Sequence, residues 1–309
     1  MKLPDTRVIV FNVAAGVVTI AALVAVLRSL VHTPALAPCT ERYPAGISFS
    51  VERGGVLVTS DDLQARLSGK DIGLGSNVKI ARIKDGPAPV AIGVTLGKGS
   101  IAPHVPSDAK GGVSFPWQPR AVQGKTAACL SYSVLLPANF DFHEGGYLPG
   151  ILGAESADDS KEGFTALLAW RRNGRIGATT WVDTRSGPVE IDPWKFPAGR
   201  WVKLEEEVIL NDPRGEDGVL RVWVDGSLAI DRTDIIYRER PDVTITGVGA
   251  SVHYGYDDAA HGAPKEATIW LTPFEIRWQQ QQAQPTAPVR APAECSATQL
   301  ASGRCNLMR

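Results

Sequence analysis

The stretch GRWVKLEEEVILNDPRGEDGVLRVWVDG, residues 199–226, gives the clearest indication of the fold. It contains two β-rich runs, Trp201–Leu210 and Val219–Val224, on either side of the polar turn sequence NDPRGEDG. Asp225-Gly226 follows the second run, and Asp-Gly is a strong signal for a tight β-hairpin turn. The stretch therefore predicts consecutive antiparallel strands.

Similar short runs occur on both sides of this stretch, separated by Gly, Pro, Asn and Asp. They are Ala128–Leu136, Phe164–Arg171, Thr244–Tyr254 and Thr268–Trp278. Helical periodicity is scarce, and the best helix of the body is Ser60–Leu67, which Thr59 or Ser60 could cap. Strands in this number and at this spacing predict an all-β sandwich or barrel.

The composition is that of an ordinary globular protein. Of 309 residues, 44% are hydrophobic and 21% are charged, which is enough apolar material for a sizeable core. The 32 basic and 33 acidic residues leave a formal net charge of -1. Because a nucleic-acid-binding surface needs an excess of positive charge, we expect no nucleic acid partner.

The N-terminus differs from this average. Residues 8–27, VIVFNVAAGVVTIAALVAVL, carry no charge and are about as long as the ~20 residues that a helix needs to cross a bilayer. They predict a membrane anchor within residues 1–31, and Lys2 and Arg7 before the run favour a cytoplasmic N-terminus with the body in the periplasm or outside the cell. A cleaved signal peptide is the alternative, because Ala35-Leu36-Ala37 fits a cleavage site.

The sequence predicts three further segments: a proline-containing tether at 32–45, one β-domain at 46–278, and a Gln/Pro-rich tail at 279–309. The four cysteines are Cys39, Cys129, Cys295 and Cys305. They agree with export and allow three pairings, of which Cys295 with Cys305 would leave Cys39 with Cys129, and free thiols remain an alternative. No Cys or His spacing indicates zinc, and we expect neither a metal nor a cofactor.

The stretch FDFHEGGYLPGILG, residues 140–153, is the most informative for function. Gly145-Gly146 permits positive φ, and Pro149-Gly150 predicts a second turn. This stretch resembles the GGKLPGL signature of the alginate-lyase-like polysaccharide lyases, family 14 and its jelly-roll relatives. Three further similar segments follow in the expected order, LLAWRRNG at 167–174, the stretch at 199–226, and IWLTPFEIRW at 269–278.

The resemblance implies a concanavalin-like jelly-roll β-sandwich that acts on an acidic polysaccharide, with lyase activity. Two positions depart from the family pattern. Tyr147 stands where the family usually has lysine after the double glycine, and Thr165-Ala166-Leu167 stands where a Ser-x-Arg pattern leads into the family's Trp-Arg. Two charged groups associated with catalysis in family members are therefore absent, and an active enzyme would need other residues.

Elimination across a uronic acid requires a group that neutralises the carboxylate, a base for the adjacent proton, and an acid for the leaving oxygen. Arginine suits the first task, and tyrosine or histidine suits the others. If Trp170 and Val252 face the core, strand alternation turns Arg171 and His253 to the opposite face. We predict that Tyr147, Arg171 and His253 converge on one groove as catalytic residues. Further substrate contacts are expected from His143, Glu144, Thr165, Ser251, Tyr254 and Tyr256.

Other interpretations remain open. Tyr147 could serve only packing, Arg171 could be a solvated strand end, and His253 could be structural. The same fold could then be a polysaccharide-binding or envelope assembly protein without catalysis, or a structural envelope protein.

Two other acidic clusters are weaker candidates. Glu190-Ile191-Asp192 resembles glycosidase carboxylates, but Lys195 and Pro193 disfavour a hydrolase. The acidic residues between 212 and 217 fit a hairpin turn better than a calcium loop.

Overall fold

The computed structural model describes residues 16–20, 22–23, 36–67, 70–154, 163–182, 185–255 and 261–279, with the side chains of 185–193 left out. Residues 16–20 and 22–23 are helical, and most of the predicted anchor and all but the first residue of the predicted tail lie outside the described residues. Among the described residues, no helix has the length and apolar character that crossing a membrane requires.

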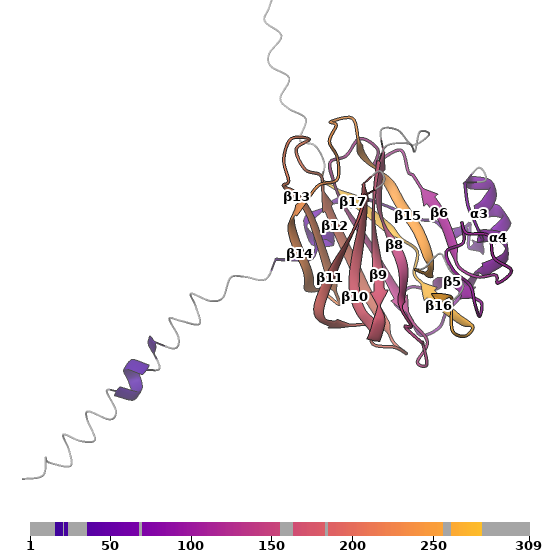
Figure 1. Ribbon diagram of the computed structural model, residues 1–309, viewed down its shortest axis with the longest axis horizontal. Helices are drawn as coiled ribbons and strands as arrows, with labels where there is room; N and C mark the ends of the chain where they lie inside the picture. The colour runs from indigo at the N-terminus through magenta and orange to yellow at the C-terminus, as the bar shows by residue number, and fades with distance from the viewer. Residues whose placement is uncertain are drawn as a thin grey trace, which may run out of the picture.

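The body is a sandwich of two antiparallel sheets (Figure 1). The nine-stranded sheet has the order β14-β13-β12-β7-β16-β5-β4, with β17 pairing both β7 and β1, and the six-stranded sheet has the order β11-β10-β9-β8-β15-β6. The first sheet comprises β1 (Ala45–Ser48), β4 (Val78–Arg82), β5 (Val90–Leu96), β7 (Ala127–Leu135), β12 (Trp201–Ile209), β13 (Gly218–Val224), β14 (Ser227–Ile235), β16 (Ala267–Leu271) and β17 (Glu275–Trp278). The second comprises β6 (Val113–Trp117), β8 (Gly145–Ala154), β9 (Gly163–Arg171), β10 (Arg175–Val182), β11 (Arg185–Lys195) and β15 (Thr244–Tyr254).

Smaller elements complete the body. These are α2 (Cys39–Arg42), α3 (Ser60–Arg66), α4 (Leu74–Asn77), the 3-10 turn η1 (Arg172–Gly174) and the hairpin of β2 (Glu52–Arg53) with β3 (Val56–Leu57). Helices α3 and α4 lie on one side of the sandwich, beside the edge strand β6 (Figure 1). Thr59 caps α3 in a capping box with Asp62, so the predicted helix is confirmed and Thr59 rather than Ser60 is its cap.

One hydrophobic core fills the space between the sheets. Alternate residues of β9 and β15, such as Leu168, Trp170, Val248 and Val252, point into it. The predicted β-sandwich is therefore confirmed, and so is the alternation on which the site prediction rests. The predicted strand at 268–278 is two strands, because Thr272 leaves the strand path and donates its backbone N–H to Ser133.

The hairpin signals at 211–226 also match the structure. The turn at 211–218 joins β12 to β13, and its carboxylates accept hydrogen bonds from turn backbone, with Asp217 Oδ1 2.9 Å from Asp212 N. Asp225 and Gly226 both adopt positive φ, as the two-residue turn between β13 and β14 requires.

One prediction for β8 is wrong. Pro149-Gly150 is not a turn but part of a continuous strand, where the pairing of β8 with β9 shifts between Leu148 and Ile151. The Gly150 backbone runs so close to β9 that an added Cβ would lie 1.8 Å from the Ala166 carbonyl oxygen. Only glycine fits this contact, which is the reason that a turn-like sequence continues as a strand.

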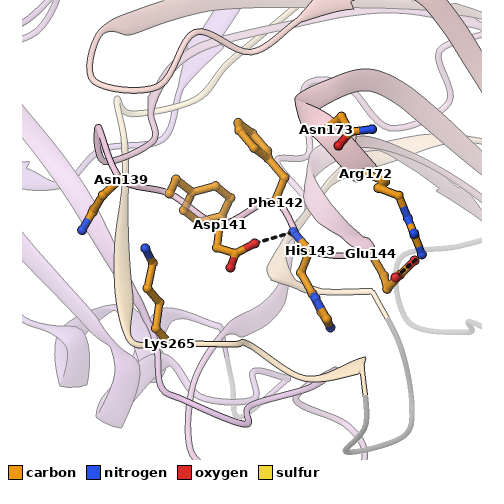
Figure 2. A pocket seen from close by; sticks show the side chains of 9 residues that line it. Asn139, Asp141, Phe142, His143, Glu144, Arg172, Asn173 and Lys265 are labelled. Atoms are coloured by element: carbon orange, nitrogen blue, oxygen red, sulfur yellow. Dashed lines mark hydrogen bonds and ion pairs between the residues drawn. The ribbon is translucent and has the colours of Figure 1, made fainter.

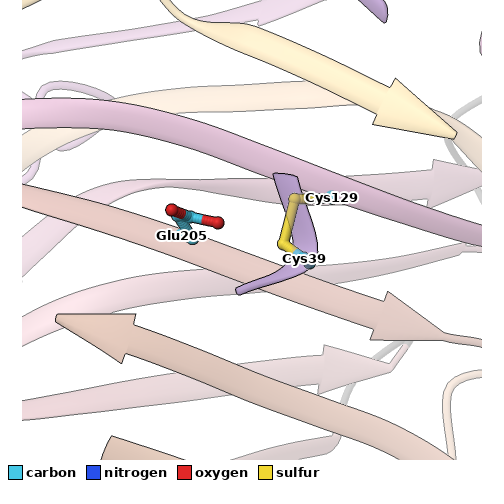
Figure 3. Close-up of side chains that lie close together, drawn as sticks. All are labelled: Cys39, Cys129 and Glu205. Atoms are coloured by element: carbon cyan, nitrogen blue, oxygen red, sulfur yellow. A yellow bond between two sulfur atoms is a disulfide. The ribbon is translucent and has the colours of Figure 1, made fainter. Parts of the chain in front are cut away.

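The described part of the predicted tether is not a free linker. Cys39 forms a disulfide with Cys129 of β7, with 5.7 Å between their Cα atoms (Figure 3). Arg42 donates two hydrogen bonds of 2.9 Å to the buried carboxylate of Glu207, and Trp223 Nε1 donates to the Leu36 carbonyl at 3.1 Å. Residues 36–43 are thus fastened to the outer side of the nine-stranded sheet.

Replacing both Cys39 and Cys129 by serine should lower the free energy of unfolding by about 2 to 4 kcal/mol, because the disulfide restricts a long loop of the unfolded chain. The measurement is equilibrium urea unfolding of the double variant and the wild type. An unchanged midpoint would show that the ion pairs hold this segment without the disulfide.

Candidate functional site

The six-stranded sheet turns one side to the core and the other side outward. We call the outward side the site face and define it by six residues of β8, β9, β10 and β15. They are Tyr147, Thr165, Arg171, Trp181, Ser251 and His253.

A β-bulge in β8 decides which side chains of that strand reach the site face. Three steps along β8, from Leu148 to Ile151, are matched by two steps along β9, from Leu168 to Ala166. The extra residue lets both Leu148 and Ile151 face the core, while Tyr147 remains on the outward side.

Two side chains from the opposite sheet form hydrogen bonds with backbone groups at the bulge. The hydroxyl of Tyr132 on β7 donates to the Pro149 carbonyl at 2.9 Å, and Glu206 Oε2 on β12 accepts from the Ile151 N–H at 3.0 Å. Glu206 is 0% exposed. The bulge is therefore held from across the core.

Tyr147 lies in a row of aromatic rings that crosses the site face. Its ring centroid is 5.1 Å from that of Trp181 and 5.3 Å from that of His253. His104, in the loop between β5 and β6, continues the row with its ring 6.5 Å from that of His253. Rings at these separations form a surface on which a sugar ring could stack.

Arg171 brings a positive charge to the same row. Its guanidinium carbon lies 5.9 Å from the centre of the Tyr147 ring. The side chain donates to Thr179 Oγ1 and to the Ala178 carbonyl at 3.4 Å, while its buried Nε has no hydrogen-bond partner in the described part of the chain. The guanidinium is thus fixed over β9 and β10 with a donor left unused.

His253 is oriented by its own strand. Its Nδ1 lies 2.6 Å from the Tyr254 carbonyl oxygen, and a carbonyl can only accept, so Nδ1 carries the proton. The lone pair is then on Nε2, the nitrogen that can act as a base. His253 is 7% exposed, so the surrounding loop and strands hold the ring in place.

The structure therefore brings Tyr147, Arg171 and His253 together on one side of the sandwich. Their catalytic roles stay predictions. Among the expected substrate contacts, Ser251 lies on the site face with its Oγ 3.0 Å from Ser114 Oγ, and Thr165 lies there opposite Trp181.

The structure corrects the expectation for Tyr254. Its side chain is 1% exposed, stacks on Phe140 and donates its hydroxyl to the Asp141 carbonyl at 2.6 Å, so it belongs to the core. It follows Val252 at an interval of two residues and therefore shares the inward side. Tyr256 lies outside the described residues.

Two members of the ring row, Trp181 and His104, were not among the sequence candidates. For Trp181 a signal existed, because it alternates with Thr179 at the end of the β-rich run RIGATTWV. His104 comes from a loop without periodicity, so only tertiary structure could place it beside His253.

His143 and Glu144 line a pocket of about 560 Å³ next to the site face (Figure 2). The wall also includes Asn139, Asp141, Arg172 and Lys265. Arg172 pairs with Glu144, and that hydrogen bond holds the pKa of Glu144 below its usual value. Lys265 points into the space from the opposite side and has no ion pair among the described residues. The pocket therefore has a cation available for an anionic group.

One group of potential metal ligands occurs among the described residues, Cys39, Cys129 and Glu205 (Figure 3). The two sulfurs are bonded to each other, whereas a metal needs the thiolate form. Glu205 Oε2 accepts hydrogen bonds from Thr40 N and Oγ1 at 3.0 and 2.8 Å. This cluster fastens the N-terminal segment and does not fit a metal site.

The pKa values of the neighbouring carboxyl groups of Glu206 and Glu207 are shifted in opposite directions. Burial raises the pKa of Glu206 well above its ordinary value of 4.5. Burial also acts on Glu207, but hydrogen bonds from Arg42, Tyr43 and Arg221 hold the pKa of Glu207 below its ordinary value. Burial therefore favours the protonated form of Glu206, whereas its neighbour Glu207 is stabilised as a carboxylate.

The change Glu206→Gln should remove a pH dependence of stability. In the wild type the folded state binds this proton more tightly than the unfolded state does, so the free energy of unfolding should fall as pH rises above 4.5 toward the raised pKa. Glutamine cannot ionise, so the variant should gain stability relative to the wild type over this range. Urea unfolding from weakly acidic to weakly alkaline pH measures the difference, and parallel curves for the two proteins would contradict a raised pKa.

Comparison with known proteins agrees with this fold. The family model described as Polysaccharide lyase 14 matches residues 86–187 and 182–274. No curated protein matches the chain.

Solved alginate lyases have the same fold. The PL-14 alginate lyase of Aplysia kurodai is 20% identical with a TM-score of 0.63, and the alignment covers 76% of this chain and 98% of that one. The alginate lyase vAL-1 of Chlorella virus is 18% identical with a TM-score of 0.57, covering 70% and 96%. A mutant of the alginate lyase Aly36B in complex with alginate tetrasaccharide is 17% identical with a TM-score of 0.57, covering 77% and 100%.

The two matched ranges of the family model together span more than half of the 309 residues, and the similar fold of the solved alginate lyases agrees with the match. The chain belongs to polysaccharide lyase family 14.

Proposed function

We propose that this protein is a lyase that cleaves a uronate polymer by β-elimination on the site face. The observation that carries the proposal is the convergence of a phenol, a guanidinium and an imidazole around the Tyr147 ring, with separations of 5.3 Å and 5.9 Å. Membership of the lyase family and the alginate lyases of similar fold support an acidic polysaccharide as the substrate class.

Each group has a distinct role in this reaction. Arg171 pairs with the uronate carboxylate, which makes the hydrogen on the neighbouring carbon more acidic. His253 Nε2 removes that proton, a carbon–carbon double bond forms, and the bond to the glycosidic oxygen breaks. The Tyr147 hydroxyl gives its proton to the departing oxygen, and the proton held by His253 restores Tyr147 directly or through solvent.

The remaining features suit binding of the sugar chain. Trp181 and Tyr147 offer ring faces for stacking, and polar Ser251 and Thr165 lie on the same side of the sheet. In the adjoining pocket, Lys265 is placed to receive the carboxylate of a further uronate.

A second function, acidic-polysaccharide binding without catalysis, is favoured by two substitutions on the same face. Tyr147 replaces the lysine expected from the family pattern. Leu167, which is 6% exposed and pairs with Thr179, replaces the expected arginine. Ultraviolet absorbance from unsaturated products, measured on a panel of alginate, glucuronan and related polymers, distinguishes the two functions. Binding without absorbance would establish the non-catalytic one.

Changing Tyr147 to Phe should abolish turnover, with a loss of about a hundredfold or more, because the variant has no proton to give to the leaving oxygen. Polymer affinity should change little, since the ring still packs between Trp181 and His253. Initial rates and equilibrium binding measure both effects.

Lys265→Ala is the matched control for this experiment. It should weaken binding of the polymer and raise KM while leaving kcat near the wild-type value, because Lys265 lies in the pocket and not in the ring row. Full turnover in the Tyr147→Phe variant would remove the hydroxyl from the mechanism.

We further infer that residues 8–27 anchor the protein in the inner membrane, with the body in the periplasm or outside the cell. The uncharged run supports an anchor, and the Cys39–Cys129 disulfide suits an oxidising compartment. The protein should stay with membranes after alkaline carbonate extraction and be cut by protease added to spheroplasts. Release of a soluble form whose N-terminus follows Ala37 would show a cleaved signal peptide instead.

A further inference from the structure

We propose that Glu206 and Tyr132 are a positioning pair for the site: acting through the bulge of β8, they hold Tyr147 on the site face. This inference rests on the proposed function for its catalytic consequence. Neither residue touches the site face, since both lie in the core between the sheets.

The first step of the argument is strand parity. The bulge of β8 lies between two regular pairs with β9, Leu148 with Leu168 before it and Ile151 with Ala166 after it. Tyr147 directly precedes the first of these pairs. If the same residues formed a regular strand without the bulge, Tyr147 and Ile151 would share one side of β8, because they are four residues apart and strand side chains alternate with a period of two. One of them would then be misplaced, with either Ile151 outside the core or Tyr147 within it.

The second step is hydrogen bonding. A bulge removes backbone groups from the regular pattern of sheet hydrogen bonds, and a buried backbone group without a partner is unfavourable. Here the Pro149 carbonyl and the Ile151 N–H flank Gly150, and they are met by Tyr132 and Glu206 respectively. Both contacts come from the nine-stranded sheet, so the register of β8 is tied to the opposite sheet.

The third step is the choice of residue. Glu206 shares the core-facing side of β12 with Leu204 and Val208, where an apolar side chain is the ordinary occupant. Glu206 Oε1 is buried and has no hydrogen-bond partner in the described residues. Burying a carboxyl group that forms a hydrogen bond through only one of its oxygens is unfavourable for stability. The hydrogen bond that Glu206 does form is the one from the Ile151 N–H. The titratable groups that face Glu206 are the phenols of Tyr132 and Tyr237, whose pKa values are raised by burial first and by Glu206 second.

The experiment compares Glu206→Gln, Glu206→Leu and Tyr132→Phe in the full-length protein. Glutamine keeps an oxygen acceptor for Ile151, whereas leucine keeps similar bulk without an acceptor. Hydrogen exchange of peptides covering 145–154, read by mass spectrometry, measures the bulge directly. Peptides from β13 and β14, which do not contain the substituted residues, serve as the internal control for global folding.

We expect exchange in the bulge peptide to be about tenfold faster in Glu206→Leu and close to wild type in Glu206→Gln. Turnover should follow the same order. The kcat of Glu206→Leu should fall by about a hundredfold because the Tyr147 hydroxyl, the proposed proton donor, is displaced, while KM stays near the wild-type value. Tyr132→Phe should show the same two changes, faster exchange in the bulge peptide and a lower kcat, but to a smaller extent. This variant tests the inference if Glu206→Leu does not fold.

Wild-type exchange in the bulge peptide of both Glu206→Leu and Tyr132→Phe would overturn the inference. So would equal losses in Glu206→Gln and Glu206→Leu, because size or charge rather than the acceptor would then matter. If the wild type cleaves no uronate polymer, the proposed function fails, and the exchange comparison alone decides whether the pair holds the strand that carries Tyr147.

Discussion

The extra residue in β8 is the constraint on which the site depends. A strand with strict alternation cannot present Tyr147 outward and also bury both Leu148 and Ile151. The bulge resolves this conflict, and it forms because Gly150 can approach the Ala166 carbonyl and because Tyr132 and Glu206 satisfy the adjacent backbone groups. The core of the sandwich and the geometry of its outer face are thus set by the same few contacts.

The two outer faces of the sandwich carry different structural features. The outer side of the nine-stranded sheet is occupied by residues 36–43, held by the Cys39–Cys129 disulfide and by the buried carboxylate of Glu207. The outer side of the six-stranded sheet carries the ring row and Arg171. The N-terminal attachment and the proposed polysaccharide-binding surface therefore lie on opposite sides of the sandwich.

Much of this arrangement could be predicted from the sequence, because alternation is a local property. The apolar residues of β9 and β15 predict that Arg171 and His253 share the outward side, and the structure places them there. The same rule applied to Tyr254 would have placed it in the core. The bulge could not be predicted, since Pro149-Gly150 has the composition of a turn and only the contacts with β9, β7 and β12 make it part of a strand.

The three consecutive glutamates of β12 show a second limit of sequence reasoning. Their charges predict exposure, yet all three are buried. Glu205 and Glu207 are covered by a segment more than 160 residues away in the chain, and Glu206 by the opposite sheet. No local pattern distinguishes a carboxylate paired with Arg42 from a buried carboxyl that accepts a hydrogen bond from the Ile151 N–H across the core.

The most direct test of the account is the mass of the products formed when the full-length protein is incubated with uronate polymers. Elimination across Tyr147, Arg171 and His253 predicts oligosaccharides with an unsaturated terminal sugar, each lighter by one water molecule than the corresponding hydrolysis product. Products that contain the added water, or bound but uncleaved polymer throughout the panel, would contradict it.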